Sequence, residues 1–271
     1  MGPVMVEPSQ TAFDGLAGGY DDVAESALGR ELRARVHTIV ESRLQAGDRI
    51  LDLGCGTGLD AAHLRSIDMV VTAVDASAAM LDVAKRRLAE TEGPPVEVLL
   101  VDVNRPEMFA KLVGRSFDHV LVNFGVVNCV ADLPGFLLAL QNTLGTGGSI
   151  AIVSMGRFCP WEIGAGLSRL RWRAATRRWR PTVYEGAEIQ YPTWRTFREA
   201  LPTGLQVTER RALGWVLPTF EQRQLLENRP RLLRSLAAVD RLGASAAARV
   251  GCGDHWVAAL KRSENSATVR A

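Results

Sequence analysis

The sequence predicts an α/β protein with a doubly wound, mostly parallel sheet of seven strands and helical insertions late in the chain. Three observations carry this prediction. Short apolar runs alternate with helical patterns between residues 50 and 154, a glycine-rich turn follows the first run, and acidic residues follow the second and third. Strands covered on both faces of a parallel sheet are continuously apolar, so these runs fit central strands.

Residues 11–46 show two apolar patterns with helical spacing, separated by Gly18 and Gly19. We expect them to form an N-terminal helical cap over residues 1–46.

The first expected strand, residues 50–53, leads directly into glycines at positions 54, 56 and 58. Glycine tolerates positive φ and lets backbone N–H groups approach a ligand closely, so the turn predicts a ligand site. A dinucleotide-binding fingerprint would need its third glycine at position 59, where the chain has Leu59.

Two further apolar runs each end in an aspartate. Residues 70–74 precede Asp75, after which a helix containing Met80 is expected, and residues 96–101 precede Asp102. Ligands of open α/β sheets bind outside the carboxyl ends of the strands, and this rule favours a ligand role for both aspartates over ordinary strand-end acids.

A fourth run, residues 117–122, ends at Asn123, and a turn over residues 144–148 leads into a fifth, residues 149–154. These elements bound a core of residues 47–155. Residues 156–265 then hold helical insertions with a sixth and a seventh strand, which we expect to face the substrate, and residues 266–271 form a tail. The helices are expected over 161–180, over 191–201 and over 220–248 with a break near Pro230, and the strands over 205–208 and 255–260.

This order of elements around Gly54-x-Gly56-x-Gly58 resembles the class I methyltransferases that use S-adenosylmethionine, strongly over residues 48–154 and loosely afterwards. The resemblance implies this cofactor, an antiparallel seventh strand, and lids over a small substrate. It also implies that the cofactor contacts the following residues: Tyr20, Asp52, Gly54, Cys55, Gly56, Gly58, Asp75, Ala76, Met80, Asp102, Val103, Asn123 and Phe124.

We therefore expect metal-free, in-line methyl transfer to a small metabolite of secondary metabolism, with oxygen slightly favoured over nitrogen or carbon as acceptor. Transfer depends mainly on near-attack geometry, sometimes with a base. The candidate catalytic residues are His255, Glu162 and Arg157. Arg157 either binds an anionic acceptor through its guanidinium or simply pairs with Glu162. His119 and Tyr191 are weaker candidates for a base.

Two other functions stay open. A pericyclase or an aminopropyl-type transferase would use the same fold and cofactor without transferring a methyl group, because a fold does not fix a reaction. A cofactor-binding subunit without turnover is the other alternative. The sequence leaves the acceptor molecule, the acceptor atom and the oligomeric state open.

Charge divides the chain: residues 1–155 hold 12 Lys and Arg against 20 Asp and Glu, and residues 156–271 hold 20 against 10. Six arginines lie among residues 169–180. Three interpretations of this cluster stay open: a solvated surface, a site that attracts an anionic or carrier-bound substrate, and a site that binds RNA. RNA binding is the least favoured, because the acidic first half of the chain would repel a polyanion. Trp172 and Trp179, seven residues apart, are expected to face the core together.

Four cysteines, at 55, 129, 159 and 252, form no C-x-x-C pair, so neither a zinc site nor a disulfide framework is indicated. We expect a cytoplasmic protein without a membrane span, a membrane partner or a signal peptide. Cys55 is expected to pack inside the turn, and His37 and His63 to be surface or packing residues on helices.

Overall fold

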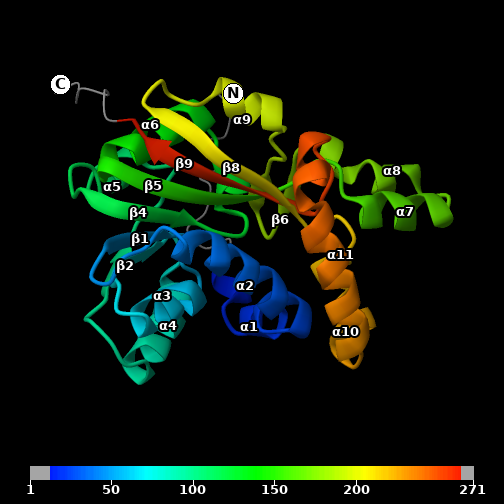
Figure 1. Cartoon of the computed structure of the whole chain (residues 1–271), viewed down its shortest axis with the longest axis horizontal. Helices are drawn as coiled ribbons and strands as arrows, with labels where there is room; N and C mark the ends of the chain where they lie inside the picture. Colours follow the sequence, from blue (N-terminus) through cyan, green and yellow to red (C-terminus); the bar gives the residue numbers. More distant parts are fainter. Residues whose placement is uncertain (1–12, 264–271) are drawn as a thin grey trace, which may run out of the picture.

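The computed structural model describes residues 13–263, and its centre is a seven-stranded sheet in the order β3-β2-β1-β4-β5-β9-β8 (Figure 1). Strand β9 runs antiparallel to both β5 and β8, and the other neighbours are parallel, which confirms the predicted fold class. The strands span Arg49–Leu53 (β1), Val70–Asp75 (β2), Glu97–Leu100 (β3), Phe117–Val122 (β4), Leu144–Met155 (β5), Leu205–Leu213 (β8) and His255–Arg262 (β9).

One face of the sheet is covered by helices from both ends of the chain. Leu32 and Leu64 pack against Ile50 and Val71 of the strands, and Leu226 joins them from the C-terminal half. The helices on this side span Ala27–Glu41 (α2), Leu59–Ser66 (α3), Ala78–Glu90 (α4), Gln224–Glu227 (α10) and Pro230–Arg249 (α11), with Tyr20–Ala24 (α1) beside α2.

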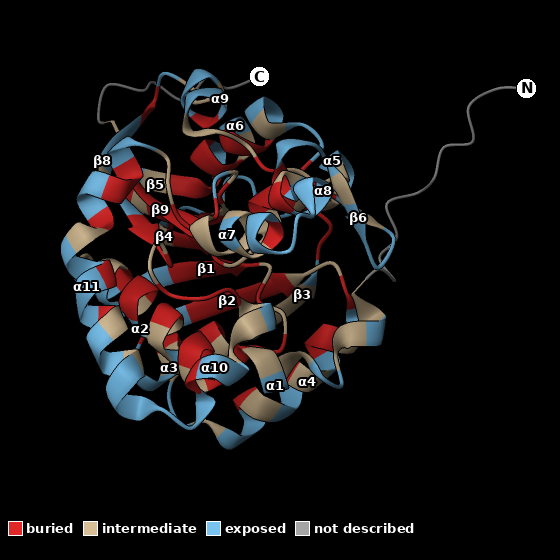
Figure 2. Cartoon of the chain, turned by 90° about the vertical axis from the view of Figure 1, so that its right-hand side faces the viewer, coloured by how far each residue is buried: buried red, intermediate tan, exposed pale blue. Residues whose placement is uncertain are grey.

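The opposite face carries a second apolar cluster, in which Leu137 and Phe197 pack against Phe117 and Ile150 of the sheet. Its helices span Pro106–Phe109 (α5), Leu133–Thr143 (α6) and Trp194–Glu199 (α9). Figure 2 shows the buried strands lying between the two helical layers. This layering places the ends of β1, β2 and β4 side by side at one edge.

Side-chain caps fix where the helices after the strands begin. The Ser77 hydroxyl accepts a hydrogen bond from the Met80 N–H at 3.1 Å, and Asp132 accepts one from the Gly135 N–H at 3.1 Å. Such caps satisfy N–H groups that have no partner inside the helix. The start of α4 is therefore held directly at the carboxyl end of β2.

The insertion after β5 projects from one side of the molecule (Figure 1). The prediction of one helix over residues 161–180 is wrong, because Leu170 has a φ of 55° and interrupts it. The segment instead forms short elements spanning Pro160–Ser168 (α7), Trp172–Ala175 (α8) and Arg177–Trp179 (η3).

A hairpin that the sequence analysis did not predict follows η3, formed by Thr182–Tyr184 (β6) and Ala187–Ile189 (β7). Glu185 and Gly186 at its tip both have positive φ, 49° and 87°, as a two-residue hairpin turn requires.

Trp172 and Trp179 are exposed, at 68% and 52%, so the prediction that both face the core is wrong. The seven-residue spacing places two side chains on one face only within a continuous helix, and here the chain turns between α8 and η3. The insertion therefore presents tryptophan and arginine side chains together on its surface.

Within residues 13–263, no helix is both long and apolar enough to cross a membrane. The proposed boundaries of cap, core and insertion region stay predictions, and the expected tail, residues 266–271, lies outside the described residues.

Candidate functional site

The turn after β1 needs glycine for two different reasons. Gly54, Gly56 and Gly58 have φ values of 76°, 53° and 81°. A Cβ at position 54 would lie 2.1 Å from Cγ2 of Val126, and one at position 58 would lie 2.9 Å from Cβ of Ala84. The turn therefore packs closely against the segment after β4 and against α4.

Asp75, at the end of β2, braces this turn from the next strand. Its two carboxylate oxygens accept hydrogen bonds from the Gly56 N–H and the Ser77 N–H, each at 2.9 Å. Burial raises the pKa of Asp75, and the Ser77 and Gly56 N–H groups partly offset that rise. Each oxygen keeps a second lone pair that can accept a hydrogen bond from a ligand hydroxyl. Ala76 beside it is half-buried and Met80 is buried.

Asp102 follows β3, is buried, and belongs to a short loop network. It accepts a hydrogen bond from the Asn104 N–H at 2.9 Å, and the Asn104 amide in turn donates to the Cys129 carbonyl at 3.0 Å. The half-buried Val103 lies between them. The loop after β3 is thus tied to the segment after β4, Val126–Cys129 (η2).

The end of β4 combines strain with a buried amide. Phe124 has a φ of 36°, which is uncommon for a large side chain, and such strain clusters at functional sites. Its ring meets those of Phe220 and His255 edge to face, with centroids 6.1 and 5.4 Å away. The Asn123 amide donates to Oδ2 of Asp60 at 2.8 Å.

A small hollow lies beside the glycine turn, and the sequence analysis did not anticipate two of its charged residues, Arg33 and Asp60. Arg33 of α2 forms an ion pair with Asp60 of α3, and its guanidinium lies 5.3 Å from the centre of the Phe124 ring. The hollow is lined by Tyr20, Arg33, Gly54, Cys55, Thr57, Leu59, Asp60, Asn123 and Phe124.

Buried polar atoms without a hydrogen-bond partner lie beside the glycine turn. Asp52 of β1 is buried and neither of its carboxylate oxygens has a hydrogen-bond partner, and Nε of Arg33 is buried and also unpartnered. Burial, together with the nearby Asp60 carboxylate, raises the pKa of Asp52 well above its ordinary value. A buried polar atom without a partner has a high free energy, so these atoms are suited to a ligand that carries both an ammonium and a carboxylate group.

The N-terminal segment closes over the turn. A Cβ at position 56 would lie 3.8 Å from Cε1 of Tyr20, and burial raises the pKa of the Tyr20 hydroxyl. Asp21 accepts a hydrogen bond from the Thr57 hydroxyl at 2.6 Å and pairs with Arg87 at 2.7 Å. These contacts hold α1 against the glycine turn and α4.

The Cys55 thiol is buried, and burial raises its pKa well above the ordinary value, with the nearby Asp52 adding to the rise. A thiol with a raised pKa is a poor nucleophile, so the geometry agrees with Cys55 as a packing residue.

At the exit of β5, the structure corrects one expectation about Arg157 and Glu162. Glu162 does not pair with Arg157; it pairs with Arg177 and, at 3.0 Å, with Arg178, so it is poorly placed to act as a base. Arg157 is half-buried and no hydrogen bond or ion pair is formed by its guanidinium within the described structure. It therefore remains available for an anion.

Arg178 is one of the six arginines among residues 169–180, but its side chain is buried. It links η3 to the residues after β5 and before β9. It donates to the Gly156 carbonyl at 3.1 Å, to the Asp254 carbonyl at 2.9 Å and to the Asp254 carboxylate at 2.6 Å. Asp254 precedes His255, whose Nδ1 lies 3.1 Å from the Asp254 carboxylate. Arg178 thus fixes the exit of β5 and the start of β9.

The other candidate bases have structural partners. His119 lies 2.8 Å from the Ser149 hydroxyl and 2.9 Å from the Asp48 carboxylate, and the Tyr191 hydroxyl lies 3.1 Å from that of Thr182. His255 is buried, and its ring contacts that of Phe124, which lines the hollow.

Comparison with known proteins agrees with this geometry. Residues 50–148 match a family described as "Methyltransferase domain". A demethylmenaquinone methyltransferase of Clavibacter sepedonicus is 34% identical over 149 residues, 54% of this chain and 58% of the relative. A malonyl-[acyl-carrier protein] O-methyltransferase of Serratia marcescens is 32% identical over 154 residues, 57% and 55% of the two chains. The chain thus spans little more than half the length of these relatives.

Solved structures share the fold over nearly the whole chain. The N-methyltransferase NodS of Bradyrhizobium japonicum, in complex with S-adenosyl-L-homocysteine, aligns with a TM-score of 0.58 at 13% identity, covering 94% of this chain and 99% of its own. The [4+2]-cyclase SpnF aligns with a TM-score of 0.59 at 15% identity, covering 94% and 95%. The match over residues 50–148, the two curated relatives and the glycine turn support a class I S-adenosylmethionine-dependent methyltransferase, and the solved structures show that the fold is shared.

Proposed function

We propose that this protein transfers a methyl group from S-adenosylmethionine to a small metabolite in a biosynthetic reaction, with an oxygen atom favoured as acceptor. The observation that carries the proposal is the set of unpartnered polar atoms of Asp52 and Arg33 beside the glycine turn. These atoms suit the methionine end of the cofactor, which carries one ammonium and one carboxylate group.

The rest of the site fits the remaining parts of the cofactor. Asp75 has free lone pairs toward a ribose diol, and Asp102 lies at the next strand end for the adenine amino group. Ala76, Met80 and Val103 would supply apolar contacts around these groups. Tyr20, which covers Gly56, would close the site over the bound cofactor.

The bound cofactor supplies an electrophilic methyl group on a sulfonium ion. The protein's own contribution is to hold the acceptor in line with that group and to exclude water. Phe124, Phe220 and His255 form an aromatic wall on this side of the hollow. We place the acceptor between this wall and Arg157, with no metal required and with His255 as the first candidate for a base.

Arg157 supports an anionic acceptor, because a half-buried guanidinium without a protein partner fits a carboxylate or phenolate. Such an acceptor presents oxygen to the methyl group. The two curated relatives act, by their names, on demethylmenaquinone and on malonyl-[acyl-carrier protein]. A carrier-bound acceptor would also meet the exposed arginines at 169, 171, 173 and 180; we propose no nucleic-acid partner and no membrane partner.

All four cysteines are free thiols in the structure, which supports action in the cytoplasm, where thiols stay reduced.

The similarity to the [4+2]-cyclase SpnF supports one alternative function, a reaction on the same fold without methyl transfer. Product mass separates the two. Methyl transfer adds one methyl group to the acceptor and yields S-adenosylhomocysteine, whereas a cyclase leaves the mass unchanged.

Titration calorimetry with S-adenosylhomocysteine tests the proposal. Asp75→Ala should weaken binding by roughly 1.5–3 kcal/mol, the scale of lost charge-assisted hydrogen bonds. Asp132→Ala is the matched control, because Asp132 also accepts a backbone hydrogen bond as a helix cap but lies on α6, outside the lining of the hollow. Equal affinity in wild type and Asp75→Ala, or no binding to the wild type, would refute the assignment.

A further inference from the structure

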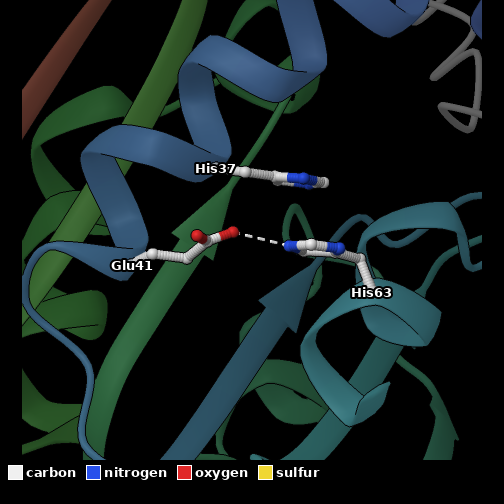
Figure 3. A group of neighbouring side chains, drawn as sticks. All are labelled: His37, Glu41 and His63. Atoms are coloured by element: carbon white, nitrogen blue, oxygen red, sulfur yellow. Dashed lines mark hydrogen bonds and ion pairs between the residues drawn. The ribbon is translucent and has the colours of Figure 1, made fainter. Parts of the chain in front are cut away.

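Two histidines and a glutamate meet between α2 and α3 (Figure 3). His37 and Glu41 lie one turn apart on α2, His63 lies on α3, and one possible ligand atom from each lies within 4.8 Å of the other two. The two imidazole rings stack in parallel, with centroids 3.9 Å apart and an angle of 3° between their planes. His63 Nε2 lies 2.6 Å from the Glu41 carboxylate.

His37 is held from outside this group. Its Nε2 lies 2.7 Å from Oδ1 of Asp60, which also forms an ion pair with Arg33. A carboxylate accepts hydrogen bonds, so this contact engages Nε2 and leaves Nδ1 of His37 for an ion. Histidines that bind metals commonly donate their other ring N–H to a carboxylate in this way.

We propose that His37, Glu41 and His63 bind a divalent transition metal ion of the Zn²⁺ class. Imidazole and carboxylate ligands suit zinc, and two histidines with one glutamate leave a fourth position for water. Metal–ligand bonds of about 2.1 Å in a tetrahedron place ligand atoms about 3.4 Å apart, so the 4.8 Å span must contract.

The parallel rings must also turn, because a metal ion lies in the plane of each imidazole that binds it. The side chains of Glu41 and His63 have the freedom to adjust, since they are 42% and 34% exposed, whereas that of His37 is 12% exposed and held by Asp60. His37 would therefore be the fixed ligand toward which the other two move.

This ion would lie outside the proposed cofactor site but would be linked to it through Asp60, which also contacts Arg33 and Asn123 in the hollow. Any effect of the metal on cofactor affinity is matched by an equal effect of the cofactor on metal affinity. This linkage rests on the proposed function, whereas metal binding itself does not.

Calorimetric titration of the metal-stripped full chain with Zn²⁺, in the absence of cofactor, tests the site. We expect one ion per chain, and His63→Gln should weaken binding by at least about 100-fold, since even an outer-shell partner contributes about 10–100-fold. Glutamine keeps a donor for Glu41. The matched control is His119→Gln, because His119 also pairs with a carboxylate but lies on β4; its affinity should equal that of the wild type.

Replacement by Co²⁺ identifies the ligands by absorption, because thiolate ligation adds a charge-transfer band that histidine and carboxylate do not. The proposal is overturned if the wild type binds no Zn²⁺, if His63→Gln binds as tightly as the wild type, or if the Co²⁺ form shows the thiolate band. If His63→Gln does not melt cooperatively, Glu41→Gln replaces it, because Glu41 is exposed at the helix surface.

A second titration addresses the linkage. Zn²⁺ should change the affinity for S-adenosylhomocysteine in the wild type and leave it unchanged in His63→Gln. Equal affinities with and without Zn²⁺ in the wild type would refute the linkage, and the cofactor-free metal titration keeps that result separate from the proposed function.

Discussion

Arg178 offers the most informative test of how the acceptor side is held together. Its guanidinium is 5% exposed and pairs with the Asp254 carboxylate, itself 3% exposed, at 2.6 Å. It also bonds the Glu162 carboxylate and the carbonyls of Gly156 and Asp254. Arg178→Ala would leave the buried Asp254 carboxylate without its arginine partner, while Glu162 would keep Arg177 and the Asp254 carbonyl would keep the Gly156 N–H.

Removing one partner of a buried ion pair destabilises a protein by about 3–5 kcal/mol. At about 2–4 °C per kcal/mol for a chain of this size, Arg178→Ala should lower the melting temperature by roughly 6–20 °C. The neighbouring Arg177 is the matched control. It pairs with Glu162 and Glu221 but is 46% exposed, so Arg177→Ala should change stability by at most about 1 kcal/mol.

Urea unfolding of the two variants measures these differences directly. The double variant Arg178→Ala/Asp254→Ala should lose less unfolding free energy than the two single variants lose together, because the effects of two substitutions within one ion pair are not additive. If Arg178→Ala is no less stable than Arg177→Ala, or if the double variant is fully additive, Arg178 does not hold the β5 exit to the β9 start as described.

Three further predictions concern the turn, the acceptor and pH. Gly54→Ala should weaken S-adenosylhomocysteine binding at least about 5–30-fold, from about 1–2 kcal/mol for an L-residue at positive φ, and further through the contact of 2.1 Å between the new Cβ and Cγ2 of Val126. Adding Val126→Ala removes that contact but not the strain in φ, so it should restore part of the affinity in calorimetry. Arg157→Ala should lower kcat/KM for the acceptor at least about tenfold, roughly 1.4 kcal/mol, with melting temperature unchanged; normal turnover would place the acceptor elsewhere. The pKa of Asp254 is lowered in the folded state, because His255 and Arg178 outweigh the opposing effect of burial. The contribution of the ionised Asp254 to stability should therefore be constant above the unfolded pKa of about 3.9, and should be lost as the pH falls through the lower folded pKa. Urea unfolding of wild type and Asp254→Asn checks this, and a difference that shrinks between pH 8 and pH 5 would contradict it.

The sequence determined the sheet and the glycine turn, because both are encoded locally. Mostly apolar runs marked the central strands, and the fourth, Phe117–Val122, coincides with the prediction residue for residue. Gly54, Gly56 and Gly58 alternate along five residues of the chain, so the positive φ values that they adopt could be anticipated from their spacing. Asp75 is the last residue of its strand, and the parallel register brings it to the turn.

The tertiary structure decided which charged side chains meet. Arg33 and Asp60 are 27 residues apart, and Arg178 and Asp254 are 76 apart, so no local pattern distinguishes them from the other arginines and aspartates of their helices and loops. The prediction that Trp172 and Trp179 both face the core was wrong, because helical periodicity holds only within a continuous helix and the helix is interrupted at Leu170. Periodicity and turn chemistry act over a few residues, whereas ion pairs, burial and the grouping of His37 with His63 depend on how separate elements pack.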